Sequence, residues 1–313
     1  MIAYLNGEFV PLVDAKLPVW DFGFTMGVSL TERLRTYSGQ LPLLDLHLER
    51  MFAGAEVIGM GGAIDRAELA RVIEEVVQQN LPLVQAGVEL SIGVCITPGS
   101  MGAMSPEGEQ SDSPTVLVTA TQLQAWMWQD AYRDGVRLMT VDVQEIPGEC
   151  IPRTLKHRNR LHYYLAEQQA TARSPGSRAL LLDADGFITE GTTASIVAVK
   201  DGKLIRPNVS KVLPSVSLSY ALPMLIGMGL EVVEKDSTVA EFQAADEVLW
   251  FSSPMAVLPV SAINGVTIGS YEGQNADPNN AMHRPVLNSV LSIWSERTGT
   301  SLVYRKKRKK KKR

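Results

Sequence analysis

Apolar residues recur along the chain with two different periods, and the changes of period predict the order of helices and strands. From residue 43 to residue 59 they follow one another at steps of three and four, which marks one face of a helix. A second amphipathic helix is predicted after Asp65, which forms a capping-box-like pair with Glu68. The runs "VELSIGVCIT" and "PTVLVTAT" predict strands, and "IAYL" and "FVPL" on either side of Asn6-Gly7 predict a hairpin.

The pattern pauses after Thr121, where "QLQAWMWQDAYRDG" has little strand character, and the pause predicts a connection between two domains. Beyond it, strands are predicted at "VRLMTVDV", "RALLLDADGFITEG", "ASIVAVKDGKLIRP", "EVVEK" and "DEVLWFSS", with helices near 214–228 and 286–294. Strands and helices mix without regular alternation, so we predict an α+β fold. The expected parts are an N-terminal domain at 1–120, a linker at 121–134, a C-terminal domain at 135–300 and a disordered basic tail at 301–313.

Charge is distributed unevenly along the chain. The formal net charge is −4, but residues 305–313 are all Lys or Arg, so the remaining chain carries 21 basic residues against 34 acidic ones. An acidic body disfavours general nucleic-acid binding, and we expect nucleic acid to be contacted only through the tail. The simpler interpretation of the tail is a solvated, self-repelling segment.

Cysteine content and hydropathy narrow the class of protein further. The only cysteines are Cys95 and Cys150, so the sequence predicts neither a disulfide framework nor a metal site. The start "MIAYLNGEFV" lacks a basic region followed by an apolar one, and no apolar run is long enough for a membrane span. We therefore expect a cytoplasmic protein, and 45% apolar residues suffice for two domains with cores.

Two segments carry candidate chemistry. In "LKHRNRL", Lys156 is followed by His157, Arg158 and Arg160, and nearby cations favour the neutral amine that a nucleophilic lysine needs. In "FITEGTTAS", Glu190 lies 34 positions later at the end of a predicted strand, beside small residues, where a carboxylate can face a ligand ring. Taken singly, each segment is better explained by a solvated turn.

Taken together, the lysine and the carboxylate match the needs of pyridoxal phosphate. This cofactor requires an amine for its aldehyde, an acid for its ring nitrogen and a cup for its phosphate. Phosphate cups are built from backbone N–H groups at helix starts, hydroxyl groups and a cation. The chain offers all three in "LPSVSLS", in "FSSP" and in Arg50.

On these residues the chain resembles the class IV, branched-chain-type family of pyridoxal-phosphate enzymes, which includes branched-chain and D-amino-acid aminotransferases and aminodeoxychorismate lyases. The resemblance covers about residues 2–270 and rests on six segments in the family's order. These are "YLNGEFVP", "DFGFTMGVSLTERLRTYSGQLPLLDLHLERM", "LKHRNRL", "FITEGTTAS", "VLPSVSLS" and "LWFSSPMAVLPVSAINGVTIG". It implies a two-domain protein of fold type IV, usually a homodimer, with pyridoxal 5'-phosphate in a cleft between the domains.

The resemblance also implies roles for individual residues. Lys156 resembles the catalytic Schiff-base lysine, Glu190 the partner of the ring nitrogen, and Arg50 the arginine that clamps the phosphate. Val216 and Ser217 correspond to the phosphate-binding start of a helix, and Ser253 to a later phosphate-binding threonine. These replacements by serine keep a hydroxyl group, so phosphate binding remains expected.

The departures from the family concern the substrate. Ser195 stands where members often carry Asn, Thr31 replaces the aromatic residue before Glu32, and Pro98 stands where an arginine often traps a substrate carboxylate. The specificity rules of the named subfamilies therefore do not transfer. "LKHRNRL" resembles the lyase version of the lysine segment more than the branched-chain version.

Several other residues are expected to be structural. His47, one helical turn before Arg50, is interpreted so, and Trp126 and Trp128 are expected to pack. Arg33 and Arg35 share one face of a predicted strand, for which a solvated face is the default and a substrate contact by Arg35 the alternative. Met101 and Met104 lie in a loop that is expected to cover the substrate pocket.

Three functions remain as hypotheses. The first is an aminotransferase that moves an amino group between an amino acid, with branched-chain amino acids among the candidates, and a 2-keto acid through a Schiff base at Lys156. The second is an aminodeoxychorismate lyase that releases pyruvate and gives 4-aminobenzoate. The third is a binding protein that acts through its tail, which requires a decayed cofactor site. Lys156, Glu190 and Arg50 are all present, which disfavours the third.

Overall fold

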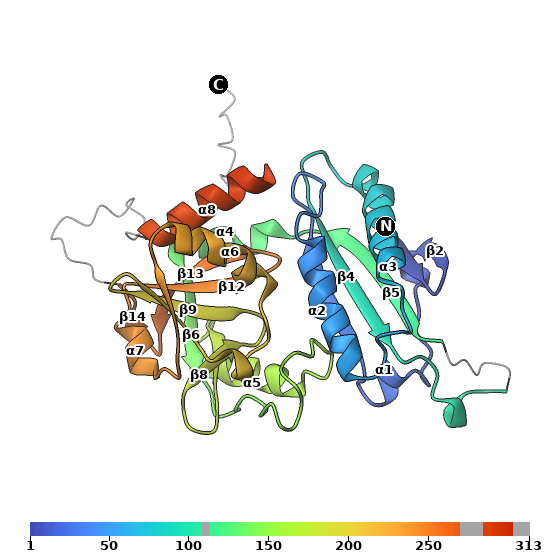
Figure 1. Ribbon diagram of the computed structural model, residues 1–313, viewed down its shortest axis with the longest axis horizontal. Helices are drawn as coiled ribbons and strands as arrows, with labels where there is room; N and C mark the ends of the chain where they lie inside the picture. Colours follow the sequence, from blue (N-terminus) through green and yellow to red (C-terminus); the bar gives the residue numbers. More distant parts are fainter. Residues whose placement is uncertain (108–112, 270–283, 303–313) are drawn as a thin grey trace.

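The structure is a computed structural model that describes residues 1–107, 113–269 and 284–302. Two β-sheets stand side by side, each with helices packed against it, and the chain passes from one to the other through residues 123–134 (Figure 1). This mixture of helices and strands confirms the predicted α+β fold. Of the expected basic tail at 301–313, residues 303–313 lie outside the described residues.

The first sheet is built from the N-terminal part of the chain. Its strand order is β2-β1-β5-β4-β3, and every neighbouring pair is antiparallel. β1 (Ile2–Leu5) and β2 (Glu8–Pro11) form the predicted hairpin, with Asn6 and Gly7 both at positive φ, as its two-residue turn requires. The other strands are β3 (Leu30–Arg35), β4 (Leu90–Thr97) and β5 (Thr115–Gln122).

Two helices cover one face of this sheet. α2 (Leu44–Val57) and α3 (Arg66–Asn80) bury the apolar stripes that the sequence predicts, including Leu48, Met51 and Ile73. The side chain of Asp65 caps α3 by accepting the Glu68 N–H at 2.7 Å. The side chain of Glu68 does not return the bond but pairs with Arg71, so the expected capping box is only half formed.

Within the described residues the second sheet has nine strands, in the order β11-β10-β9-β12-β13-β6-β7-β8, with β14 paired to β13. β8 and β9 also contact each other, and a bridge links Gly191, the last residue of β8, to Ala194, just before β9, so the sheet curls back on itself. The strands are β6 (Val136–Thr140), β7 (Arg178–Leu182), β8 (Ile188–Gly191), β9 (Ser195–Lys200), β10 (Lys203–Arg206), β11 (Glu231–Glu234), β12 (Glu247–Ser252), β13 (Ala256–Ile263) and β14 (Val266–Thr267).

Helices pack on two sides of the second sheet. α6 (Val216–Gly227) and α8 (Pro285–Thr298) contact each other and β12, and bury Leu225 and Trp294. α5 (Leu161–Arg173) packs on β6 and β7 in a separate small core (Figure 1). Shorter helices are α1 (Phe22–Thr25), α4 (Gln129–Asp134) and α7 (Val239–Gln243), with 3₁₀ turns at Leu12–Asp14, Leu81–Leu83, Gly102–Met104, Ala125–Trp128 and Val209–Lys211.

The connection between the sheets is helical. It contains a 3₁₀ turn and then α4, and the hydroxyl of Tyr132 donates to the Met255 carbonyl at 2.5 Å, which ties the connection to the second sheet. The division at 121–134 into two domains stays a prediction.

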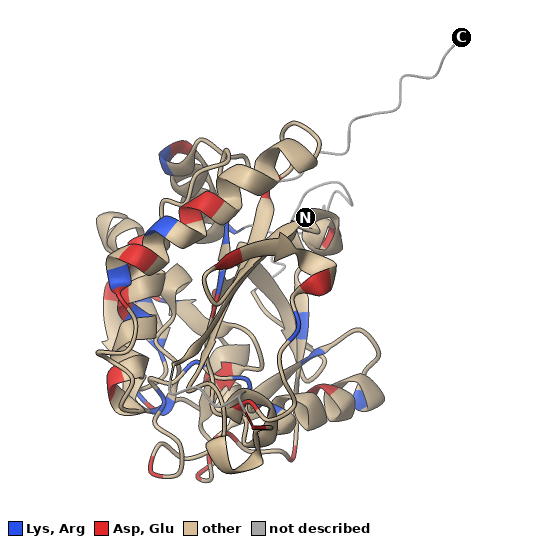
Figure 2. Cartoon of the chain, turned by 90° about the vertical axis from the view of Figure 1, so that its right-hand side faces the viewer, with Lys and Arg blue, Asp and Glu red and all other residues tan. Residues whose placement is uncertain are grey.

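Charged residues are interleaved on the outer helices, as Figure 2 shows for the side of the molecule that faces the viewer. On α3, for example, Arg71 pairs with both Glu68 and Glu75. None of the helices in the described ranges combines the length and apolar character that crossing a membrane requires.

Candidate active site

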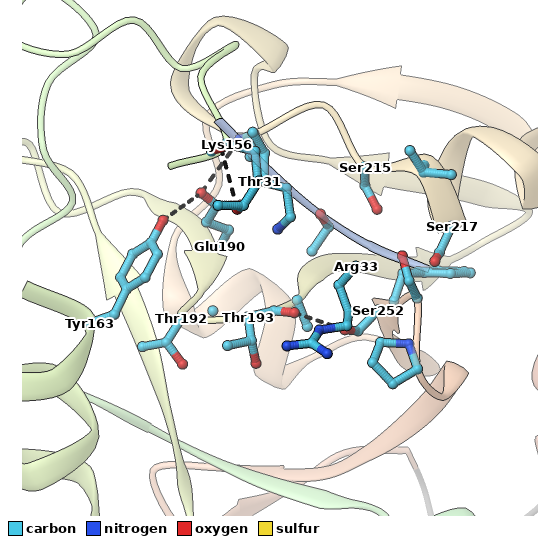
Figure 3. A pocket seen from close by; sticks show the side chains of 18 of the residues that line it. Thr31, Arg33, Lys156, Tyr163, Glu190, Thr192, Thr193, Ser215, Ser217 and Ser252 are labelled. Atoms are coloured by element: carbon cyan, nitrogen blue, oxygen red, sulfur yellow. Dashed lines mark hydrogen bonds between the residues drawn. The ribbon is translucent and has the colours of Figure 1, made fainter. Parts of the chain in front are cut away.

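A cavity of about 430 Å³ lies where the two sheets approach each other. The first sheet and α2 contribute Glu32 of β3 and Arg50 of α2 to its wall, and the second sheet contributes Glu190 of β8. Lys156 reaches the cavity from the segment between β6 and α5 (Figure 3). The structure thus brings together residues that are up to 224 positions apart, since Thr31 and Met255 both line the wall.

Lys156 is held beside β3, because its carbonyl accepts the Thr31 N–H at 2.8 Å. Desolvation of its amine, followed by the positive charges of Arg50 and Arg160, lowers the pKa of Lys156 from 10.5 to about 7. Sequence analysis attributed the expected neutral form of Lys156 to the neighbouring cations His157, Arg158 and Arg160. Of these, only Arg160 is a main cause, and the stronger cation is Arg50, which comes from α2.

Glu190 is a buried carboxylate within β8, not a residue of a solvated turn. Its Oε1 accepts from Arg153 Nη2 at 2.5 Å, from the Tyr163 hydroxyl at 3.2 Å and from the Leu213 N–H at 3.4 Å. Burial raises the pKa of Glu190 to about 7, while Arg153 acts in the opposite direction. None of these three contacts uses Oε2. This oxygen is therefore available to accept a hydrogen bond from a donor in the cavity.

Arg50 is fixed by a buried acid. Its Nε and Nη2 donate to the two oxygens of Glu32 at 2.7 Å and 2.6 Å, and its Nη1 donates to the Pro214 carbonyl at 2.6 Å. His47 Nδ1 lies 2.6 Å from the same Glu32. Burial by itself raises the pKa of Glu32, but Arg50 and His47 more than offset this and hold it at about 2. His47 therefore acts in the structural role that the sequence predicts, as part of the support for Arg50.

The start of α6 supplies hydroxyl groups to the cavity wall. Ser215 is the N-cap, and its Oγ accepts the Leu218 N–H at 3.3 Å. Val216 and Ser217 follow in the first turn, where backbone N–H groups have no partner within the helix. The Ser217 hydroxyl is buried and has no hydrogen-bond partner in the part of the chain that the structure describes. Both residues line the cavity.

Ser253 completes this end of the cavity. It follows directly after β12, and its hydroxyl lies 3.5 Å from His47 Nε2. The expected phosphate-binding residues Arg50, Val216, Ser217 and Ser253 thus line one cavity with Lys156 and Glu190. This arrangement combines a cation, hydroxyl groups and free helix N–H groups, which can hold an anion such as phosphate.

The solvated face expected for Arg33 and Arg35 is wrong. Arg35 is buried, donates to the carbonyls of Thr36 and Pro254 at 3.1 Å and 3.0 Å, and lies 4.5 Å from the centre of the Tyr37 ring. Arg35 is thus a structural residue and does not line the cavity among the described residues. Arg33, two positions earlier, does line it.

The expectations for the tryptophans and methionines were only partly right. Trp128 packs against a core of the second sheet that includes Leu138 and Trp250, and it also lines the cavity. Trp126 is 67% exposed and so is not a packing residue. Met101 and Met104 are not among the described residues that line the cavity, and Met104 is exposed. The predicted cover of the pocket by these two methionines is therefore not seen.

Sequence reasoning missed Arg153 and Tyr163, the two side chains that hold Glu190. Arg153 also donates to Glu145 at 2.7 Å, so it lies between two carboxylates. Arg153 precedes Lys156 by only three positions, but its partner lies 37 positions away. The one signal in the sequence was the density of basic residues around Lys156, which is equally compatible with solvent exposure.

Comparison with known proteins gives a consistent result. The family model for amino-transferase class IV matches residues 29–263. A protein of Methanocaldococcus jannaschii that is provisionally named a branched-chain-amino-acid aminotransferase is 30% identical, over 86% of this chain and 90% of its own length. The D-alanine aminotransferase of Bacillus licheniformis is 26% identical, over 93% of this chain and 98% of its own length.

Solved structures show the same fold. A branched-chain amino acid aminotransferase from T.th., complexed with N-(5'-phosphopyridoxyl)-L-glutamate, superposes with a TM-score of 0.79 at 25% identity and covers 95% of this chain and 94% of its own. The 4-amino-4-deoxychorismate lyase of Pseudomonas aeruginosa superposes with a TM-score of 0.73 at 22% identity, over 94% of this chain and 98% of its own, which shows a shared fold. These likenesses confirm the expected fold type.

Proposed function

The chain belongs to the class IV aminotransferase family, and we propose that it transfers an amino group between an amino acid and a 2-keto acid with pyridoxal 5'-phosphate bonded to Lys156. The single observation that carries this assignment is the pairing of Lys156 and Glu190 in one cavity. Their pKa values are shifted in opposite directions, to about 7 in each case. Such a pair of perturbed groups in a cavity is typical of an active site.

The residues of the cavity fit this cofactor. Its aldehyde requires an amine, which Lys156 supplies, and its ring nitrogen requires an acid, for which Oε2 of Glu190 is available. Its phosphate fits the start of α6, where the buried Ser217 hydroxyl lacks a partner among the described residues, together with Arg50 and Ser253.

The protein's own groups then have defined tasks. With its pKa near 7, a substantial fraction of Lys156 is neutral at physiological pH, so the amine could take the proton from the substrate Cα and, once protonated, donate it again. Glu190 holds the proton on the ring nitrogen, supported by Arg153 and Tyr163. When bound, pyridoxal phosphate supplies a ring that accepts the electron pair left at Cα. One lysine thus serves as the anchor, the base and the acid.

A spectroscopic experiment tests the proposal. Reconstituted protein is expected to absorb visible light, and borohydride should attach the cofactor to the peptide that contains Lys156. A donor screen against one keto acid should compare D- and L-forms of branched-chain amino acids, alanine and glutamate, because the relatives include branched-chain and D-alanine aminotransferases. Labelling of a different lysine would refute the assignment.

A lyase that releases pyruvate from aminodeoxychorismate is the second candidate. The observation that favours it is the segment "LKHRNRL", which resembles the lyase version. Both reactions begin with removal of the Cα proton by the same lysine, so Lys156 and Glu190 do not separate them. Pyruvate release in the absence of an acceptor keto acid would identify the lyase.

We also propose that the active form is a homodimer and that residues 1–120 and 135–300 form two domains joined at 121–134. Exposed apolar side chains support the dimer, since Phe24 is 72% and Met26 59% exposed, and Leu161 is 66% exposed. These positions are near one another, because Gly27 lies against Asn159. Light scattering on wild type and on Phe24→Glu should show a dimer that the charge weakens.

A further inference from the structure

Among the described residues, three guanidinium groups at the cavity have no acidic partner. Arg33, Arg158 and Arg160 all line it, and within the described ranges no carboxylate forms an ion pair with any of them. The other three arginines of the cavity differ in this respect. Arg50 pairs with Glu32, Arg153 with Glu145 and Glu190, and Arg178 with Glu167. The cavity therefore carries uncompensated positive charge on one set of residues.

Hydrogen bonds of the backbone, with backbone and with side-chain partners, bring these three arginines together. The segment after Lys156 runs beside the start of β3, where the Thr31 N–H donates to the Lys156 carbonyl at 2.8 Å and the Arg158 N–H donates to the Ser29 hydroxyl at 3.0 Å. Arg160 is oriented by its own segment, since its Nε donates to the His157 carbonyl at 2.7 Å. The position of this arginine cluster (Arg33, Arg158 and Arg160) is thus set by the backbone.

Arg33 and Lys156 line the same cavity, and Arg33 lies on β3 close to Thr31, the residue whose N–H donates to the Lys156 carbonyl. It is two residues beyond Thr31 on the same face of β3, which corresponds to about 7 Å along the strand. That face points away from α2 and α3, whose core takes Leu30 and Leu34. Figure 3 shows Arg33 among the side chains of the cavity, and its contact with the Ser91 hydroxyl is long, at 3.4 Å.

The mutual repulsion of these cations lowers the pKa values of two of them. Burial, then Arg158 and Arg160, lower the pKa of Arg33, and burial, then Arg158, lower the pKa of Arg160. An anion placed among the three groups relieves this repulsion. A guanidinium group is planar and forked, which suits two-point binding of a carboxylate.

We infer that Arg33, with Arg158 and Arg160, binds a second carboxylate of the substrate, and that this cluster selects substrates with two carboxylates over those with apolar side chains. The inference rests on the proposed function, because the substrate's amino group must reach Lys156. Three guanidinium groups exceed what a single α-carboxylate neutralises. A branched apolar side chain placed here would remove water from cations without replacing it, which is unfavourable.

Two kinds of molecule carry this chemistry. One is a linear acidic amino acid or 2-keto dicarboxylate, and the other is the carboxylated ring of aminodeoxychorismate. The arms of the experiment separate them, because the first transfers its amino group to a keto acid and the second releases pyruvate without one. Either result supports the inference about the arginines.

The direct test is binding of two matched, unreactive acids to the reconstituted enzyme by calorimetry. Glutarate has two carboxylates, and 4-methylvalerate has one carboxylate and a branched apolar end. Wild type should bind glutarate at least ~10-fold more tightly, and added salt should weaken glutarate binding the more strongly. Arg33→Met should reduce glutarate affinity by ~10- to 100-fold and leave 4-methylvalerate within about threefold. Arg33→Lys keeps the charge but loses the forked shape, so its glutarate affinity should lie between those of wild type and Arg33→Met.

Arg158→Met provides a second variant, because Arg158 is exposed and its replacement should not impair folding. It should lower glutarate affinity by a smaller factor. The ratio of kcat/KM for glutamate to that for leucine should fall in the same order across the variants. Equal binding of the two acids by wild type, or an unchanged ratio in Arg33→Met, would overturn the inference. Failure of the proposed function would look different: no amino acid would react and borohydride would not label Lys156, while glutarate binding would still report on the arginines.

Discussion

Arg153 and Glu190 form a short, buried ion pair, with Nη2 2.5 Å from Oε1, and the other arm of the same guanidinium group lies 2.7 Å from Glu145. One cation therefore compensates two buried carboxylates. Without it, burial would push the pKa of Glu190 higher than the value of about 7 that it has in the cofactor-free chain. The protonation of the candidate ring partner thus depends on a side chain that is not expected to touch the ring.

Replacement of Arg153 tests this dependence. Arg153→Met should raise the pKa of Glu190, so the acidic limb of the pH profile of kcat/KM should move to higher pH, and turnover at pH 7 should fall. Because two buried carboxylates lose their cation, the free energy of unfolding should also fall by roughly 3–5 kcal/mol. Arg153→Lys should restore the pH profile in part. A loss of stability with an unmoved profile would show that Arg153 serves the fold alone.

Glu190→Gln addresses the ring partner directly. The variant should still bind cofactor, since Lys156 and the start of α6 are unchanged, but an amide does not keep the ring nitrogen protonated as a carboxylate does. Turnover should drop by ~10²-fold or more, comparable to the loss of a positioned electrostatic stabiliser. The loss should fall on removal of the Cα proton, which a larger kinetic isotope effect with substrate deuterated at Cα would reveal. Near-normal turnover at full cofactor occupancy would mean that Glu190 does not face the ring.

In the cofactor-free chain, Lys156 should lower the free energy of unfolding by an amount that depends on pH. Its pKa falls from 10.5 in the unfolded chain to about 7 in the fold, so the folded state loses stability as pH drops from 10.5 toward 7. Lys156→Met removes this cost. The variant should exceed wild type by a few kcal/mol near pH 7, and the difference should shrink as pH rises to 10.

Denaturant unfolding at several pH values above 7 measures this difference. The pKa of Glu190 is raised from 4.5 to about 7, so the stability that Glu190 contributes is lost as pH rises from 4.5 to 7. The measurements lie above this range. Lys16→Met, at an exposed lysine, is the matched control and should give a constant difference. Parallel curves for Lys156→Met and wild type would contradict the shifted pKa.

Ser217→Ala should have opposite effects on the cofactor-free chain and on cofactor binding. Its hydroxyl is buried without a partner among the described residues, so its removal should leave the Tm of the cofactor-free chain unchanged or raise it. The affinity for pyridoxal phosphate should fall by ~10-fold or more, because a hydrogen bond to a charged group is lost.

Ser215→Ala is the control for this experiment, two residues earlier in the same segment. It removes the N-cap bond to Leu218 and should destabilise the chain by about 1 kcal/mol. Equal cofactor affinity in Ser217→Ala and wild type would show that the hydroxyl does not reach the phosphate.

The amino-acid sequence determined the local elements and the candidate chemistry. The hairpin at Asn6-Gly7, the stripes of α2 and α3 and the strands around Glu190 follow from side chains within a few positions of one another, because period and turn conformation are local properties. Lys156 and Glu190 were identified as a pair only because one cofactor needs both groups, and the family resemblance supplied Arg50 and the start of α6.

Only the tertiary structure decided which charges meet. Arg50 and Arg160, not His157 and Arg158, join desolvation in lowering the pKa of Lys156, and Arg153 reaches Glu190 across 37 positions. Arg33 and Arg35 share one face of a strand, yet one lines the cavity and the other is buried against the Pro254 carbonyl. The strength of a charge's effect depends on its distance and hydration in space, and these are set by the packing of elements that lie far apart along the chain.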